Sequence, residues 1–86
     1  MAERVHTYSD VVTSSTGVRY RVHAEGERNE LGSWYGWLTF EAMDGSGRVL
    51  RTERETTQRD REALAYWAGG LEPIYLDGAL GRAVST

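Results

Sequence analysis

The segment Trp34–Phe40, with the sequence WYGWLTF, constrains the fold of this chain more than any other feature. It holds two of the three tryptophans and the only phenylalanine, and its aromatic composition is typical of a β-strand. Alternation along a strand divides its large side chains between two faces: Trp34, Leu38 and Phe40 on one, Tyr35, Trp37 and Thr39 on the other. One face of such a strand belongs to the core, so the second aromatic face must be covered by something else or serve in binding.

The rest of the chain predicts three further strands around this one. Residues 18–25 alternate apolar and polar side chains and give the strongest strand pattern, and residues 5–13 are rich in β-branched residues. Residues 48–54 follow the glycine-rich turn Asp44–Gly47, and Ser14–Gly17 is a second tight turn. The strands at 5–13, 18–25, 34–43 and 48–54 therefore form an antiparallel meander.

The lengths of the two turns predict how the strands pair. A simple first hairpin sets Val11 opposite Tyr20, Asp10 opposite Arg21 and His6 opposite Glu25, unless a bulge at Gly17 shifts the register. A three-residue second turn sets Ala42 opposite Leu50, Phe40 opposite Thr52 and Glu41 opposite Arg51.

Two short amphipathic helices are predicted after the strands. Thr57 is the expected N-cap of the first helix, and Asp60, three residues later, is an imperfect capping-box partner. Gly69-Gly70 is expected to end this helix. Pro73 is expected near the start of the second. The apolar stripes are Leu64, Trp67, Ala68 and Leu71 in the first helix, and Leu76, Ala79, Leu80 and Ala83 in the second.

These elements predict a single α+β domain over residues 1–86, with two helices packed on one face of a four-stranded antiparallel sheet. We expect the covered face to carry Val11, Val18, Tyr20, Val22, Leu38, Phe40, Ala42 and Leu50. Gly78 and Gly81 weaken the second helix, and we expect them to allow close packing against the sheet or a partner.

Composition excludes several kinds of chemistry. The chain has no cysteine, which removes disulfides, thiol nucleophiles and cysteine-based metal sites. All ten basic residues are arginines, so a Schiff-base lysine is impossible; this usage is typical of a GC-rich genome, and we expect a bacterial source. No apolar leader or membrane-spanning run is present, so we expect a cytoplasmic protein without a membrane anchor.

The uncovered sheet face holds the candidate binding residues. It should display His6, Tyr8, Asp10, Arg19, Arg21, His23, Tyr35, Trp37, Glu41 and Arg51. Among these, Trp37, Tyr35, Arg19, Arg21 and His23 form an aromatic and cationic surface suited to docking a protein or stacking planar groups. The alternative is an ordinary solvated face with cross-strand charge pairs.

Three functions fit this pattern. The first is a non-catalytic interaction module that forms a homodimer or docks another protein through this face or the C-terminal helix. The second is binding of single-stranded nucleic acid or a small ligand, which the net charge of −3 disfavours for nucleic acid. The third is a small enzyme that uses His6 or His23 on adjacent strands, which requires a concave pocket around a histidine.

No cofactor or metal is expected. The acidic residues Glu53, Glu55 and Asp60 could ligate a hard cation, but interspersed arginines favour a strand end and helix start. Tyr66 lies off the helical stripe, where we expect exposure, whereas Trp67 belongs to the core.

Overall fold

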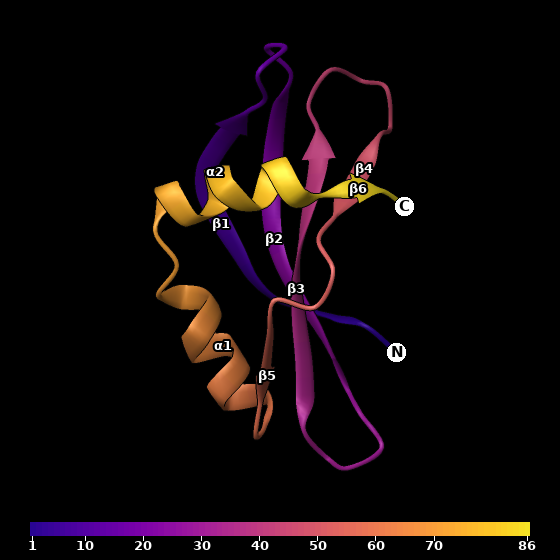
Figure 1. Cartoon of the computed structure of the whole chain (residues 1–86), viewed down its shortest axis with the longest axis vertical. Coiled ribbons are helices and arrows are strands. Elements are labelled where there is room, and N and C mark those ends of the chain that lie inside the picture. Colours follow the sequence, from indigo (N-terminus) through magenta and orange to yellow (C-terminus); the bar gives the residue numbers. More distant parts are fainter.

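A computed structural model describes all 86 residues and confirms the α+β class. The elements are β1 (Glu3–Thr13), β2 (Arg19–Arg28), β3 (Trp34–Ala42), β4 (Val49–Arg51), β5 (Thr56–Gln58), α1 (Arg61–Gly69), α2 (Pro73–Arg82) and β6 (Val84–Ser85). All strand pairs are antiparallel, and both helices lie on the same side of the twisted sheet (Figure 1).

The sheet is more extended than the predicted meander. Its order is β1-β2-β3-β4-β6, and β5 pairs with the other end of β3. Residues 52–55 link β4 to β5 and stay bonded to β3, because the Thr52 N–H donates to the Leu38 carbonyl and the Glu55 N–H donates to that of Gly36. The expected fourth strand is thus split into β4 and a bonded linker, and β6 was not predicted.

The core lies between the sheet and the two helices. Its buried cluster contains Val12, Tyr20, Val22, Ala24, Leu38, Phe40, Ala68, Leu76 and Ala79. Val18, Ala42 and Leu50 pack against it as expected. The sheet and both helices therefore share one core, and no helix is both long and apolar enough to span a membrane.

The predicted register of the first hairpin is wrong by one residue next to the turn. Tyr20 pairs with Val12 instead of Val11, because the turn is longer: the Ser14 N–H donates to the Val18 carbonyl, and Gly17 adopts a left-handed φ of 88°. Val12 consequently enters the core, while Val11 pairs with Arg21 on the other face.

Irregularities further along β1 change the faces of its aromatic residues. The register shifts again between Arg4 and His6 and between Thr7 and Val11, so His6 pairs with Ala24 rather than Glu25. Tyr8 packs against the core, contrary to its predicted place on the uncovered face, and its hydroxyl donates to the Ala68 carbonyl at 2.7 Å. The Tyr8 and His6 rings meet edge to face, 4.5 Å apart.

The second hairpin is shifted by two residues, which preserves the faces. Phe40 pairs with Leu50 rather than Thr52, because the turn is closed by a hydrogen bond from the Ala42 N–H to the Arg48 carbonyl. Since side chains alternate with a period of two, Phe40 and Leu50 still point toward the core side.

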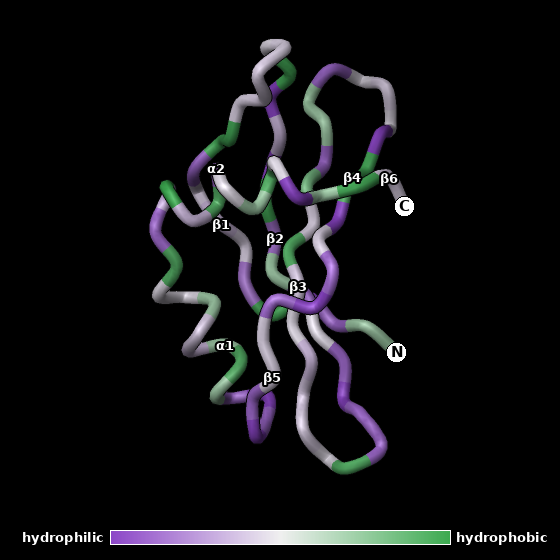
Figure 2. Tube along the Cα trace, viewed as in Figure 1, coloured by the Kyte–Doolittle hydropathy of each residue, from purple (hydrophilic) through white to green (hydrophobic).

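The first helix begins later than predicted. Thr57 lies in β5, and the N-cap is Asp60, whose carboxylate accepts the Ala63 N–H at 2.8 Å. Gly70 caps the helix end, and Pro73 occupies the first turn of α2, as predicted. Figure 2 shows the apolar stretches of both helices in green and the strongly polar segment between β5 and α1 in purple.

A pair of facing glycines allows α1 to pack closely against the sheet. Gly26 and Gly36 are cross-strand partners, and a Cβ at either position would lie 2.2 and 2.4 Å from methyl groups of Leu64. Leu64 is fully buried, so α1 packs its leucine directly onto backbone where neither strand carries a side chain.

Candidate functional site

The face of the sheet away from the helices is the candidate site, and we call it the open sheet face. Strand register places on it Arg4, Thr7, Val11, Thr13, Arg19, Arg21, His23, Glu25, Glu27, Tyr35, Trp37, Thr39, Glu41, Val49 and Arg51. Arg54 joins them because its guanidinium lies over the ring of Tyr35. All five candidate residues from the sequence, Arg19, Arg21, His23, Tyr35 and Trp37, lie on this face.

Trp37 is covered by its own chain, which corrects the expectation of an accessible aromatic ring. Only 5% of its surface is exposed, and the Arg51 guanidinium lies 4.2 Å from the ring centroid. The Trp37 indole N–H is buried without a hydrogen-bond partner. The sequence had placed Arg51 on this face, but its position over the indole depends on the strand register and could not be predicted.

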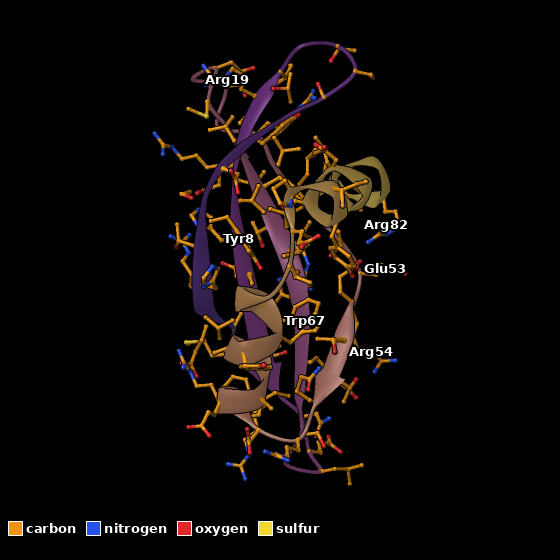
Figure 3. The ribbon with its side chains drawn as sticks, turned by 90° about the vertical axis from the view of Figure 1, so that its left-hand side faces the viewer. Tyr8, Arg19, Glu53, Arg54, Trp67 and Arg82 are labelled. Atoms are coloured by element: carbon orange, nitrogen blue, oxygen red, sulfur yellow. The ribbon has the colours of Figure 1, made fainter.

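Tyr35 is covered in the same manner by an arginine outside the regular strands. The Arg54 guanidinium lies 4.7 Å from the Tyr35 ring centroid. Arg54 comes from the linker between β4 and β5, and in Figure 3 it lies on the edge of the molecule away from Arg19. Sequence reasoning assigned Arg54 only to a polar strand end and so missed this contact.

His23 belongs to a hydrogen-bonded network on the open sheet face. It is 5% exposed, and its Nε2 lies 2.5 Å from Glu41 Oε1 while its Nδ1 lies 3.2 Å from the Thr7 hydroxyl. Arg4 reaches the same Glu41 oxygen at 4.0 Å. The neutral imidazole satisfies both contacts if Nε2–H donates to Glu41 and Nδ1 accepts from Thr7.

The enzyme hypothesis requires a concave pocket around a histidine, and neither His6 nor His23 lines a described surface depression. A hydroxyl, an imidazole and a carboxylate are in the order of a catalytic triad, but of these three residues only Glu41 lines a described surface depression. His6 lies elsewhere, against Tyr8, so the two histidines do not share a site. No three of the histidine, aspartate and glutamate side chains come together in a way that could hold a metal ion.

The acidic side chains of the open sheet face are all engaged. Glu25 accepts the Thr39 hydroxyl at 2.8 Å, Glu27 lies 3.1 Å from the N-terminal amine, and Glu41 bonds to His23. By contrast, four arginines of this face have no carboxylate within 4.0 Å: Arg19, Arg21, Arg51 and Arg54. The face therefore carries cationic groups that the chain itself does not neutralise.

Charge is also divided between the two sides of the molecule. The open sheet face has five arginines and three glutamates, a net charge of +2, within a chain whose net charge is −3. The remaining residues hold the other five arginines and ten carboxylates, a net charge of −5. An acidic chain thus presents one locally positive face.

The helix side carries a different surface feature, a shallow groove of about 730 Å³ between β5 and α1. Its lining residues are Gln58, Arg59, Glu62, Ala63, Tyr66 and Trp67. Tyr66 is 87% exposed, as expected, while Trp67 is half-buried and lies between α1 and the neighbouring β-strand in Figure 3. The Trp67 ring meets the Tyr75 ring of α2 edge to face, 6.5 Å away.

Glu55 ties α2 to the linker between β4 and β5 through one carboxylate oxygen. Its Oε1 accepts the Tyr75 hydroxyl at 2.5 Å and an Arg82 N–H at 2.6 Å. Burial and the bond to Glu55 raise the pKa of Tyr75, and burial together with the nearby Tyr75 raises the pKa of Tyr8 to about 12. Both phenols remain neutral donors, and their role is to hold the helices in place.

No family model, no curated protein and no solved structure matches this chain. The residues and geometry described above are accordingly the basis for a functional assignment.

Proposed function

We propose that this protein is a small non-catalytic interaction module, acting in the cytoplasm of a bacterium, that docks another protein through its open sheet face. The observation that carries this proposal is the set of four arginines without a carboxylate partner on the positive face of an acidic chain. Arginine is enriched at protein interfaces, where its guanidinium forms bidentate contacts with carboxylates.

The charge of the open sheet face favours a different protein over a second copy as the partner on this side. In a two-fold dimer the same patch meets itself, so two faces that each carry a net charge of +2 would oppose one another. A homodimer would need the helix side instead, where Gly78 and Gly81 are exposed on α2 rather than packed on the sheet. Self-association through α2 is therefore a separate outcome of the test.

Binding of nucleic acid by base stacking is disfavoured. Stacking needs a free aromatic face, and the rings of Trp37 and Tyr35 each have an arginine guanidinium over them. The rest of the chain is strongly acidic, which opposes a long polyanion.

In-cell photocrosslinking tests this proposal. A photoreactive residue placed at Val49, on the open sheet face, should yield one discrete adduct with another protein. The adduct should disappear in R51Q/R54Q and persist in R28Q/R48Q, which removes the same charge from exposed arginines that have no carboxylate partner and lie off this face.

Two results would refute the proposal. One is the absence of any protein adduct from the open sheet face, and the other is an adduct that R51Q/R54Q leaves unchanged. Sedimentation of the purified chain decides the oligomeric question: a concentration-dependent dimer unaffected by R51Q/R54Q would assign self-association to the helix side.

A further inference from the structure

We propose that Arg51 and Arg54 together form a receptor for two carboxylates on alternate residues of an extended acidic segment. This inference rests on the proposed function and specifies the chemistry of the partner. It depends on three properties of the arginine pair: how the guanidiniums are held, how far apart they lie, and whether the chain supplies its own anion.

Both guanidiniums are held over aromatic rings. Arg51 lies 4.2 Å from the Trp37 centroid and Arg54 lies 4.7 Å from that of Tyr35. Guanidinium stacking on a ring uses the flat face of the group and leaves the N–H edge available for a bidentate contact with a carboxylate. Because the rings restrict both side chains, less conformational entropy is lost when an anion binds.

The spacing of the two platforms follows from β3. Tyr35 and Trp37 are alternate residues of one strand on the same face, which separates them by about 6.7 Å. In an extended peptide, side chains at alternate positions also point to one side with the same repeat. Two acidic residues separated by one residue would therefore present carboxylates at the spacing of the two rings.

No carboxylate of this chain occupies the pair. Glu53 lies between the two arginines in the sequence, yet it forms no ion pair with either, and it is exposed (Figure 3). Glu55 is already bonded to Tyr75 and Arg82. An acidic segment of a partner is consequently the complementary group that is missing.

A peptide titration followed by NMR tests the receptor. The chain has three tryptophans, so its spectrum contains three indole N–H signals, and that of Trp37 lies under Arg51. The probe is a short threonine peptide with two glutamates in the alternating arrangement Glu-Thr-Glu, and the control peptide has the same composition with its two glutamates adjacent, so that no two glutamates lie at alternate positions. We expect the Trp37 signal to shift with a millimolar dissociation constant at low salt, since exposed ion pairs are individually weak, and the shift to vanish in 1 M NaCl.

Variants assign the effect to the pair. R51Q/R54Q should weaken binding roughly three- to tenfold, whereas R28Q/R48Q should leave it unchanged. R51K/R54K retains the charge but not the planar fork, and it should bind at an intermediate level even if the glutamine variant loses the packing over Trp37.

The receptor would be overturned by equal binding of both peptides, by no shift of the Trp37 signal at low salt, or by equal binding to R51Q/R54Q. Inorganic phosphate is titrated in parallel, and phosphate binding tighter than the alternating peptide would overturn the carboxylate assignment. If the in-cell adduct depends on Arg51 and Arg54 but the peptides fail, the interaction module stands and only the acidic-segment inference falls.

Discussion

The close packing of Leu64 on two facing glycines predicts that a methyl group added at Gly36 destabilises the fold. In G36A the new methyl carbon would lie 2.4 Å from Leu64 Cδ1, whereas carbon atoms in contact prefer about 3.5–4.0 Å. Leu64 is fully buried and cannot move aside into solvent. Overpacking of this kind lowers the free energy of unfolding by about 1–3 kcal/mol. Replacing a glycine within a strand by alanine raises it by about 0.5–1 kcal/mol, which offsets part of that loss. We therefore expect G36A to lower the free energy of unfolding by about 1–2 kcal/mol.

A double-mutant cycle separates the clash from other effects. L64A alone should cost about 2–5 kcal/mol because it leaves a cavity. It also removes the clashing methyl groups, so adding G36A in the L64A background should cost nothing or stabilise slightly, apart from a 3.1 Å approach to Thr56. The expected coupling between the two substitutions is about 1–3 kcal/mol.

Gly26 supplies the matched control. A Cβ at Gly26 would lie 2.2 Å from Leu64 Cδ2 but also 2.7 Å from the backbone carbonyl oxygen of Tyr35. L64A can relieve only the first contact, so G26A should remain destabilising in that background. Urea unfolding followed by tryptophan fluorescence measures each variant. Additive effects of G36A and L64A, within about 0.5 kcal/mol, would refute the reasoning.

Two further predictions concern buried polar groups. W37F removes a buried indole N–H that has no acceptor, and this gain offsets part of the apolar contact that is lost. We therefore expect W37F to lower the free energy of unfolding by no more than about 1 kcal/mol, whereas W37A should lower it by about 3–5 kcal/mol. Equal losses for the two variants in urea unfolding would contradict this prediction. The pKa of Tyr8 is raised from 10.0 to about 12 in the folded protein, so as pH rises the Tyr8 phenol loses its proton first in the unfolded state. The contribution of Tyr8 to the free energy of unfolding is therefore fully present below about pH 10 and is lost between about pH 10 and 12. After discounting for solvent screening we expect a loss of about 1–2 kcal/mol, smaller in Y8F; an identical alkaline decline in Y8F would show that Tyr8 is not its source.

Local pattern was enough to predict the architecture and most of the core. The alternation in residues 18–25 places Tyr20 and Val22 inward, and the helical stripe places Leu64 and Ala68 against the sheet. These predictions succeed because the periods of strands and helices are properties of the backbone. Pairing near the turns was less predictable, since one additional turn residue moved Val12 into the core in place of Val11.

The sequence by itself determined that Tyr35 and Trp37 share the face of β3 opposite the core, because alternation requires it. Only the tertiary structure decided what that face became. Arg51 and Arg54 reach the two rings from β4 and from the linker after it, and His23 is enclosed by residues of β1 and β3. Such contacts join positions distant in sequence and depend on register and twist, which local periodicity does not encode. For that reason the aromatic face inferred from the sequence is, in the folded molecule, an arginine surface supported by aromatic rings.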